Sequence, residues 1–100
     1  MEKQELQIQL TPEVANGTYS NLAIIAHTPS EFVLDFVRVM PGVQKAGVQS
    51  RVIMTPEHAK RLLNALRENI AGYEQKFGEI KFHNGAAPAQ MPLAFDGGLA

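Results

Sequence analysis

Residues 22–38 read LAIIAHTPSEFVLDFVR, two apolar runs separated by four turn-forming residues. Both runs, residues 22–27 and 32–38, are rich in the aliphatic and aromatic residues that favour β-strands. The proline between them has no backbone N–H and cannot continue a ladder, so we expect the chain to reverse there. A four-residue connection is too short for a parallel crossover. The stretch therefore predicts an antiparallel pair in which His27 lies opposite Phe32.

Two further strands are predicted on either side of this hairpin. The alternation Leu6-Gln7-Ile8-Gln9-Leu10 has the period of a half-buried strand and ends at Thr11-Pro12. A last apolar run follows Pro41-Gly42 and Gly47, which are turn residues. Because all connections are short, we expect a four-stranded antiparallel meander. Its predicted strands are residues 6–10, 18–27, 32–40 and 48–54.

One long helix is predicted after the last strand. Thr55-Pro56-Glu57 supplies an N-cap, a proline at the first helical position and an acidic residue near the positive end of the dipole, and Gly78 supplies the C-terminal cap. A helix over residues 56–77 spans roughly 33 Å, enough to cover a ten-residue strand. We therefore expect an α+β fold, in the order ββββα, with the helix packed on one face of the sheet. Its apolar positions are Ala59, Leu62, Leu63, Leu66, Ile70, Tyr73 and Phe77.

Strand parity divides the predicted sheet into two faces. The register that places Asp35 opposite Arg51 gives a structural ion pair and explains two charges within apolar strands. One face then carries Tyr19, Ala23, Ile25, Phe32, Leu34, Phe36, Val48, Val52 and Met54. We expect the helix to cover that face and leave the other open, because a single helix covers a single face. An open apolar face is unusual for a monomer and predicts a homo-oligomer. The candidate oligomer interface is Leu22, Ile24, Val33, Val37 and Ile53. The heptad-like spacing of the helix permits a rival interface, in which helices pair across a symmetry axis through Ala59, Leu63, Leu66, Ile70, Tyr73 and Phe77.

The length of 100 residues and a change in composition predict the domain organisation. One α+β domain is expected over residues 1–83. From residue 84 onward the chain is rich in Ala, Pro and Gly and contains a single charge, Asp96. Such a segment buries little apolar surface, so residues 84–100 are predicted to be a disordered tail. The alternative is that the alternating Met91, Leu93 and Phe95 dock as an added strand or a short linear motif.

Composition argues against several classes of function. A formal net charge of −1 lacks the basic excess of proteins that bind nucleic-acid phosphates or anionic lipid. The absence of cysteine removes disulfides and thiolate chemistry and fits a cytoplasmic protein. His27, His58 and His83 are too widely separated for a typical metal site, and no set of residues combines an acid, a base and a nucleophile. We therefore expect no enzyme activity, no cofactor, no metal and no membrane partner.

Three segments resemble a known family. They are NGTYSNL at residues 16–22, HTPSEFVLDF at residues 27–36 and SRVIMTPEHAK at residues 50–60. Together they are similar to the small prokaryotic domain-of-unknown-function 3467 family over about residues 5–82. The resemblance implies a cytoplasmic bacterial or archaeal protein, and that family carries no known activity or catalytic residues. The order of strands and helix also resembles the subunit of the SecB export chaperone, an analogy of fold order only.

Two hypotheses for function remain. The first is a non-enzymatic protein-binding or assembly module whose partner is itself or another protein, with SecB-like binding of extended segments as its model. The alternative is a small nucleic-acid-associated regulator that uses the cations Arg38, Lys45 and Arg51, although the net charge makes a nucleic-acid partner the weaker hypothesis.

Overall fold

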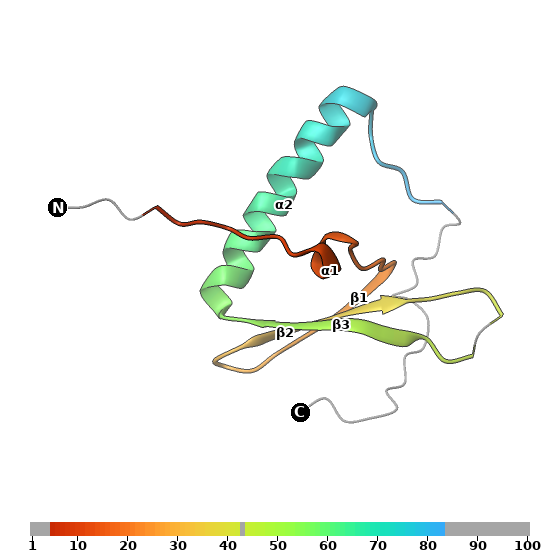
Figure 1. The fold of residues 1–100 in the computed structure, drawn as a ribbon. Coiled ribbons are helices and arrows are strands. Elements are labelled where there is room, and N and C mark those ends of the chain that lie inside the picture. The colour runs from red at the N-terminus through yellow and green to blue at the C-terminus, as the bar shows by residue number, and fades with distance from the viewer. Residues whose placement is uncertain (1–4, 43, 84–100) are drawn as a thin grey trace.

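The computed structural model describes residues 5–42 and 44–83 and has an α+β architecture (Figure 1). In these residues the sheet is antiparallel and three-stranded, in the order β1-β2-β3. One long helix follows it. The elements are α1 (Pro12–Ala15), β1 (Leu22–His27), β2 (Phe32–Arg38), β3 (Gly47–Met54) and α2 (Pro56–Phe77). The predicted disordered tail, residues 84–100, lies outside the described residues.

The predicted strand register is confirmed. His27 lies opposite Phe32 and Ile25 opposite Leu34 in the β1–β2 pair, and Asp35 lies opposite Arg51 in the β2–β3 pair. The β1–β2 turn is held by Thr28, whose Oγ1 accepts hydrogen bonds from the backbone N–H groups of Ser30 and Glu31 at 3.3 and 3.1 Å. The Thr28 N–H in turn donates to the Glu31 carbonyl at 2.8 Å. A short polar side chain thus closes the turn by replacing backbone partners.

The prediction of a fourth strand at residues 6–10 is wrong for the described chain. Pro12 starts the short helix α1 instead of merely ending a strand, and the Ala15 N–H donates to the Thr11 carbonyl at 2.9 Å. This helical turn redirects the chain, and residues 5–10 run outward from α1 without joining the sheet (Figure 1). Leu6 and Ile8 are each 87% exposed and Leu10 is 68% exposed.

Strands β1 and β2 are shorter than predicted. At one end of the pair, side-chain hydrogen bonds to the backbone replace the backbone hydrogen bonds of the ladder. The Ser20 hydroxyl donates to the carbonyls of Leu22 and Val37, at 3.0 and 3.1 Å. The Asn21 amide donates to the Val39 carbonyl at 2.9 Å and accepts from the Val39 N–H at 2.8 Å. Residues 18–21 therefore lead into the sheet as a side-chain-anchored segment, and the strand begins at Leu22.

A bulge in β3 changes one face assignment. Phe36 pairs with Ser50 but its neighbour Val37 pairs with Val48, so Gln49 is an extra residue on β3. Two residues opposite one shift the side-chain alternation beyond the bulge. Val48 was expected on the opposite face from Val37, and the bulge places the two together.

The prediction that the long helix packs on the sheet is also wrong. Helix α2 rises steeply from the end of β3 (Figure 1), and none of its residues is buried. Thr55 is the only residue between β3 and α2, and its backbone is extended, with φ −70° and ψ 155°. The chain thus has no loop in which to reverse before the helix begins, and in the structure the helix leads away from the sheet.

The described core is confined to the central strand. Leu34, Val37 and Asp35 are the buried residues, and all three belong to β2. On β1 the side chains of Leu22, Ile24 and Ala26 are half-buried, while those of Ala23, Ile25 and His27 are exposed. For this strand the observed burial is the reverse of the expected one, because α2 does not cover the face that it was expected to cover.

The N-cap of α2 gives a test of how this helix is fixed. The Thr55 Oγ1 accepts a hydrogen bond from the His58 N–H at 3.1 Å, whereas Thr11 at the start of α1 makes no such bond. Thr55→Ala is expected to lower the free energy of unfolding by about 1 kcal/mol. Thr11→Ala, the matched control, should change it much less. Equal losses for the two variants in urea denaturation would contradict the assignment.

Candidate functional site

One side of α2 carries a row of exposed apolar side chains. Its members recur at alternating spacings of three and four residues and are between 40% and 66% exposed. They are Leu63, Leu66, Ile70, Tyr73 and Phe77, and we call this row the α2 seam. Such spacing places the side chains on one narrow stripe of a helix, as in the contact seam of a coiled coil.

The C-terminal end of the α2 seam is aromatic. The rings of Tyr73 and Phe77 lie 4.9 Å apart between centroids and are tilted by 44°. The Lys76 ammonium lies 5.6 Å from the centre of the Phe77 ring. This end offers a broad apolar surface with a cation at its border, a composition that suits contact with another polypeptide.

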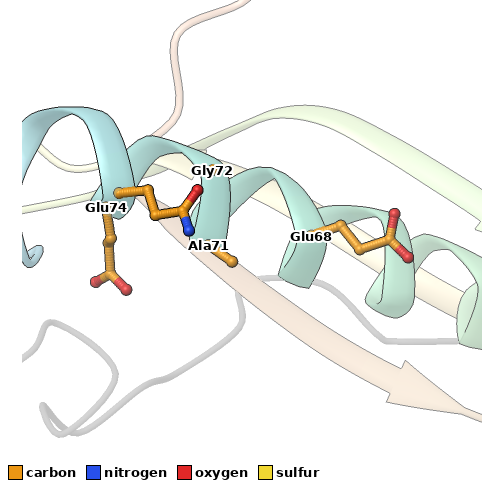
Figure 2. A pocket seen from close by; sticks show the side chains of 5 residues that line it. Glu68, Ala71, Gly72 and Glu74 are labelled. Carbon is orange, nitrogen blue, oxygen red and sulfur yellow. The ribbon is translucent and has the colours of Figure 1, made fainter.

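The concave surface beside α2 is not an enclosed ligand site. Figure 2 shows the side chains that line it, all of which come from α2 itself. They belong to Glu68, Ala71, Gly72, Glu74 and Gln75. The Glu74 carboxylate already accepts a hydrogen bond from the Ile80 N–H at 2.9 Å. Small-molecule sites usually surround their ligand, and a depression on one helix does not.

Asp35 and Arg51 form a bidentate ion pair across β2 and β3. The Arg51 Nε donates to Asp35 Oδ1 at 2.6 Å, and Nη2 donates to Oδ2 at 2.8 Å. The Asp35 side chain is 1% exposed, whereas that of Arg51 is 39% exposed. Hydrogen bonding to Arg51, reinforced by its charge, outweighs the effect of burial and holds the pKa of Asp35 below its usual value. Both carboxylate oxygens are thus already bound to the guanidinium.

The predicted oligomer-interface residues share one face of the sheet. Leu22 lies opposite Val37 and Val33 opposite Ile53, and residues that face one another across a ladder point to the same side. Their burial differs, because Val37 is 3% exposed and Ile53 is 56% exposed. Leu22, Val33 and Ile24 are half-buried. This face therefore offers less accessible apolar surface than the α2 seam.

The histidines His27 and His58 and the cation Arg38 lie in different elements of the structure. His27 stacks on Phe32, with ring centroids 5.4 Å apart, and His58 lies in the first turn of α2. The Arg38 guanidinium lies 5.8 Å from the centre of the Tyr19 ring. Within the described part of the chain, no three His, Asp or Glu side chains gather where they could hold a metal ion.

Within residues 5–42 and 44–83, no helix combines the length and the apolar character needed to cross a bilayer.

These features define a class: a small α+β domain with an antiparallel sheet, an ion pair between its central strand and an edge strand, and an exposed amphipathic helix. Within that class the chain belongs to the family described as a protein of unknown function (DUF3467), which matches residues 1–82. The resemblance drawn from the sequence is thereby confirmed. Neither the curated proteins nor the solved structures contain a match to the chain.

The exposure difference within the ion pair predicts unequal single-variant effects. Arg51→Met removes both hydrogen bonds of a carboxylate that is shielded from water, whereas Asp35→Asn leaves a guanidinium that reaches solvent. Arg51→Met should therefore lower the free energy of unfolding more than Asp35→Asn. The double replacement Asp35→Leu with Arg51→Met should cost less than the sum of the two single replacements Asp35→Leu and Arg51→Met. Strict additivity in chemical denaturation would show that the pair is not coupled.

The lowered pKa of Asp35 also predicts a pH dependence. A carboxylate that binds its proton more weakly when folded adds stability above its unfolded pKa, about 3.9, and loses it as the pH falls through the lower folded pKa. The stability difference between the parent and Asp35→Asn should be largest near neutral pH and shrink from about pH 5 downward. Glu57→Gln, which alters an exposed pair with Arg61, is the control. A difference that stays constant down to pH 2 would refute this prediction.

Proposed function

We propose that the protein is a non-enzymatic assembly module that binds another polypeptide through the α2 seam, and that its first partner is a second copy of the same chain. The observation that carries the proposal is the α2 seam itself, a coiled-coil-like row of exposed side chains on a helix without buried residues. A soluble domain gains by covering such a row, because removing apolar area from water is the main favourable term in association.

The sequence of the α2 seam favours an antiparallel second copy. If two α2 helices cross head to tail about residue 68, Leu66 of each lies level with Ile70 of the other. In the same arrangement Leu63 meets Tyr73, and Ala59 meets Phe77. In the last two pairs an aromatic side chain falls opposite a smaller one, which is an arrangement that fills a helix interface without voids. A two-fold axis between the helices makes each contact occur twice and closes the assembly.

Charges beside the α2 seam are compatible with this arrangement. In the head-to-tail pair Lys60 of one helix lies near Glu74 of the other, a contact between opposite charges that occurs twice. Arg67 lies near its own copy, which is unfavourable, but both groups are exposed and screened by salt. Two attractive contacts against one repulsive contact favour the head-to-tail orientation.

The alternative functions have less support. A nucleic-acid-associated regulator was expected to use Arg38, Lys45 and Arg51, but Arg51 is bound to Asp35 and Arg38 lies over the Tyr19 ring. An enzyme would need a cleft, and the depression beside α2 is open. The proposal retains a cytoplasmic prokaryotic setting, with which the lack of cysteine is compatible.

A charge placed in the α2 seam tests the proposal. Ile70→Glu is expected to convert a homo-oligomer into a monomer at low micromolar concentration, because a buried carboxylate without a partner is costly at an interface. Mass is measured by light scattering, where one chain contributes 11.0 kDa.

Asn64→Glu is the matched control, since it adds the same charge to the same helix outside the α2 seam. It should leave the mass of the assembly unchanged. A parent chain that is monomeric throughout, or an Ile70→Glu variant that keeps the parent mass, would refute the proposal.

A further inference from the structure

The N-terminal segment at residues 6–10 has the pattern of a strand but no ladder in the structure. Leu6, Ile8 and Leu10 alternate with Gln7 and Gln9, which is the pattern of a strand with one apolar face. All five residues are exposed, and the segment runs outward from α1 (Figure 1). An exposed strand pattern of this kind gains backbone and apolar contacts only when it reaches a sheet edge.

The sheet has an unprotected edge of matching length at β1. Strand β1 contains neither a charged residue nor a proline, and in the described chain no strand pairs with its outer side. The other edge strand, β3, carries the bulge at Gln49 and the charged Arg51, both of which are devices that discourage further pairing. Of the two edges, β1 is therefore the better acceptor.

The path of the chain favours pairing between copies. Asn21 and Ser20 fix the entry to β1 by hydrogen bonds to β2 and Val39, and α1 then carries the chain away from β1. In the structure the segment lies apart from its own β1 edge, because it runs outward from α1 (Figure 1). A second copy related by a two-fold axis presents the same edge, and the exchange closes because each copy gives one segment and receives one.

We propose that residues 6–10 of one copy add as an edge strand to β1 of a second copy, so that the sheet is completed to four strands by exchange. Side chains alternate between the two faces of a strand, so the apolar residues Leu6, Ile8 and Leu10 would join the half-buried face of Leu22, Ile24 and Ala26. Gln7 and Gln9 join the exposed face of Ala23 and Ile25. Both segments are uncharged, so no charge is buried by the pairing. This proposal and the proposed function both need a second copy of the chain, but they use different surfaces of it.

Cysteine cross-linking between different chains tests the exchange, because the natural chain has no cysteine. One sample carries only Gln7→Cys, and it is mixed with a chain that carries only Ala23→Cys or only Ile25→Cys. Residues opposite each other on neighbouring strands are close enough for a disulfide. One of the two mixtures should form a disulfide-linked heterodimer about a hundredfold faster than free chains at about 10 μM, because an assembly raises the effective concentration to millimolar.

The control mixture pairs Gln7→Cys with Gln49→Cys on the opposite edge strand and should cross-link only at the background rate. A double variant with Gln7→Cys and the reactive β1 cysteine should give interchain disulfides; an intrachain disulfide would overturn the proposal in favour of pairing within one chain. Background rates in both test mixtures would overturn it as well.

A proline in the segment separates this proposal from the α2 seam. Ile8→Pro removes a backbone donor and should return the reactive mixture to the background rate. Glu5→Pro, just outside the segment, should leave the rate unchanged. Ile70→Glu tests the α2 seam independently. If Ile70→Glu is monomeric but the cysteine mixtures in the parent background fail to cross-link, the strand exchange is wrong and the α2 seam is retained. If Ile70→Glu remains a dimer and still cross-links, the α2 seam is wrong and the strand exchange is retained.

Discussion

The one-residue connection between β3 and α2 is the constraint on which the rest of the structure depends. Thr55 serves both as the linker and as the N-cap of α2, so the helix starts as soon as the strand ends. A longer loop would let the helix turn back and bury its apolar stripe on the sheet, as α+β domains commonly do. With a single extended residue, the α2 seam and the sheet stay apart and both keep apolar surface exposed.

The sequence predicts those features that depend on short-range chemistry. The β1–β2 turn follows from Thr28 and the neighbouring proline, and the helix limits follow from Thr55, Pro56 and Gly78. Even the Asp35–Arg51 register is recoverable, because the cost of an unpaired charge in an apolar strand leaves few alternatives. Local propensity and charge pairing act over a few residues or one ladder, and the sequence displays both.

The features that were not predicted depend on geometry that periodicity does not encode. Alternation at residues 6–10 indicates a strand but not which sheet edge receives it, and Pro12 suits a helix start as well as a strand end. The bulge at Gln49 carries no proline or glycine signal at that residue, so the face of Val48 was misassigned. The apolar positions of α2 were predicted correctly. Which surface covers them depends on the direction in which α2 leaves Thr55.

The buried ion pair clarifies why this sheet keeps its register although its faces are poorly covered. A sheet held mainly by apolar contacts can slip by two residues and keep the same faces. The Asp35–Arg51 contact cannot slip, because any other register buries Asp35 without a donor. The β1–β2 register is held separately, by the Thr28 turn at one end and by the Asn21 contacts with Val39 at the other. Together with the Asp35–Arg51 pair between β2 and β3, these contacts define the geometry of the edge to which, in our proposal, a second copy adds its strand.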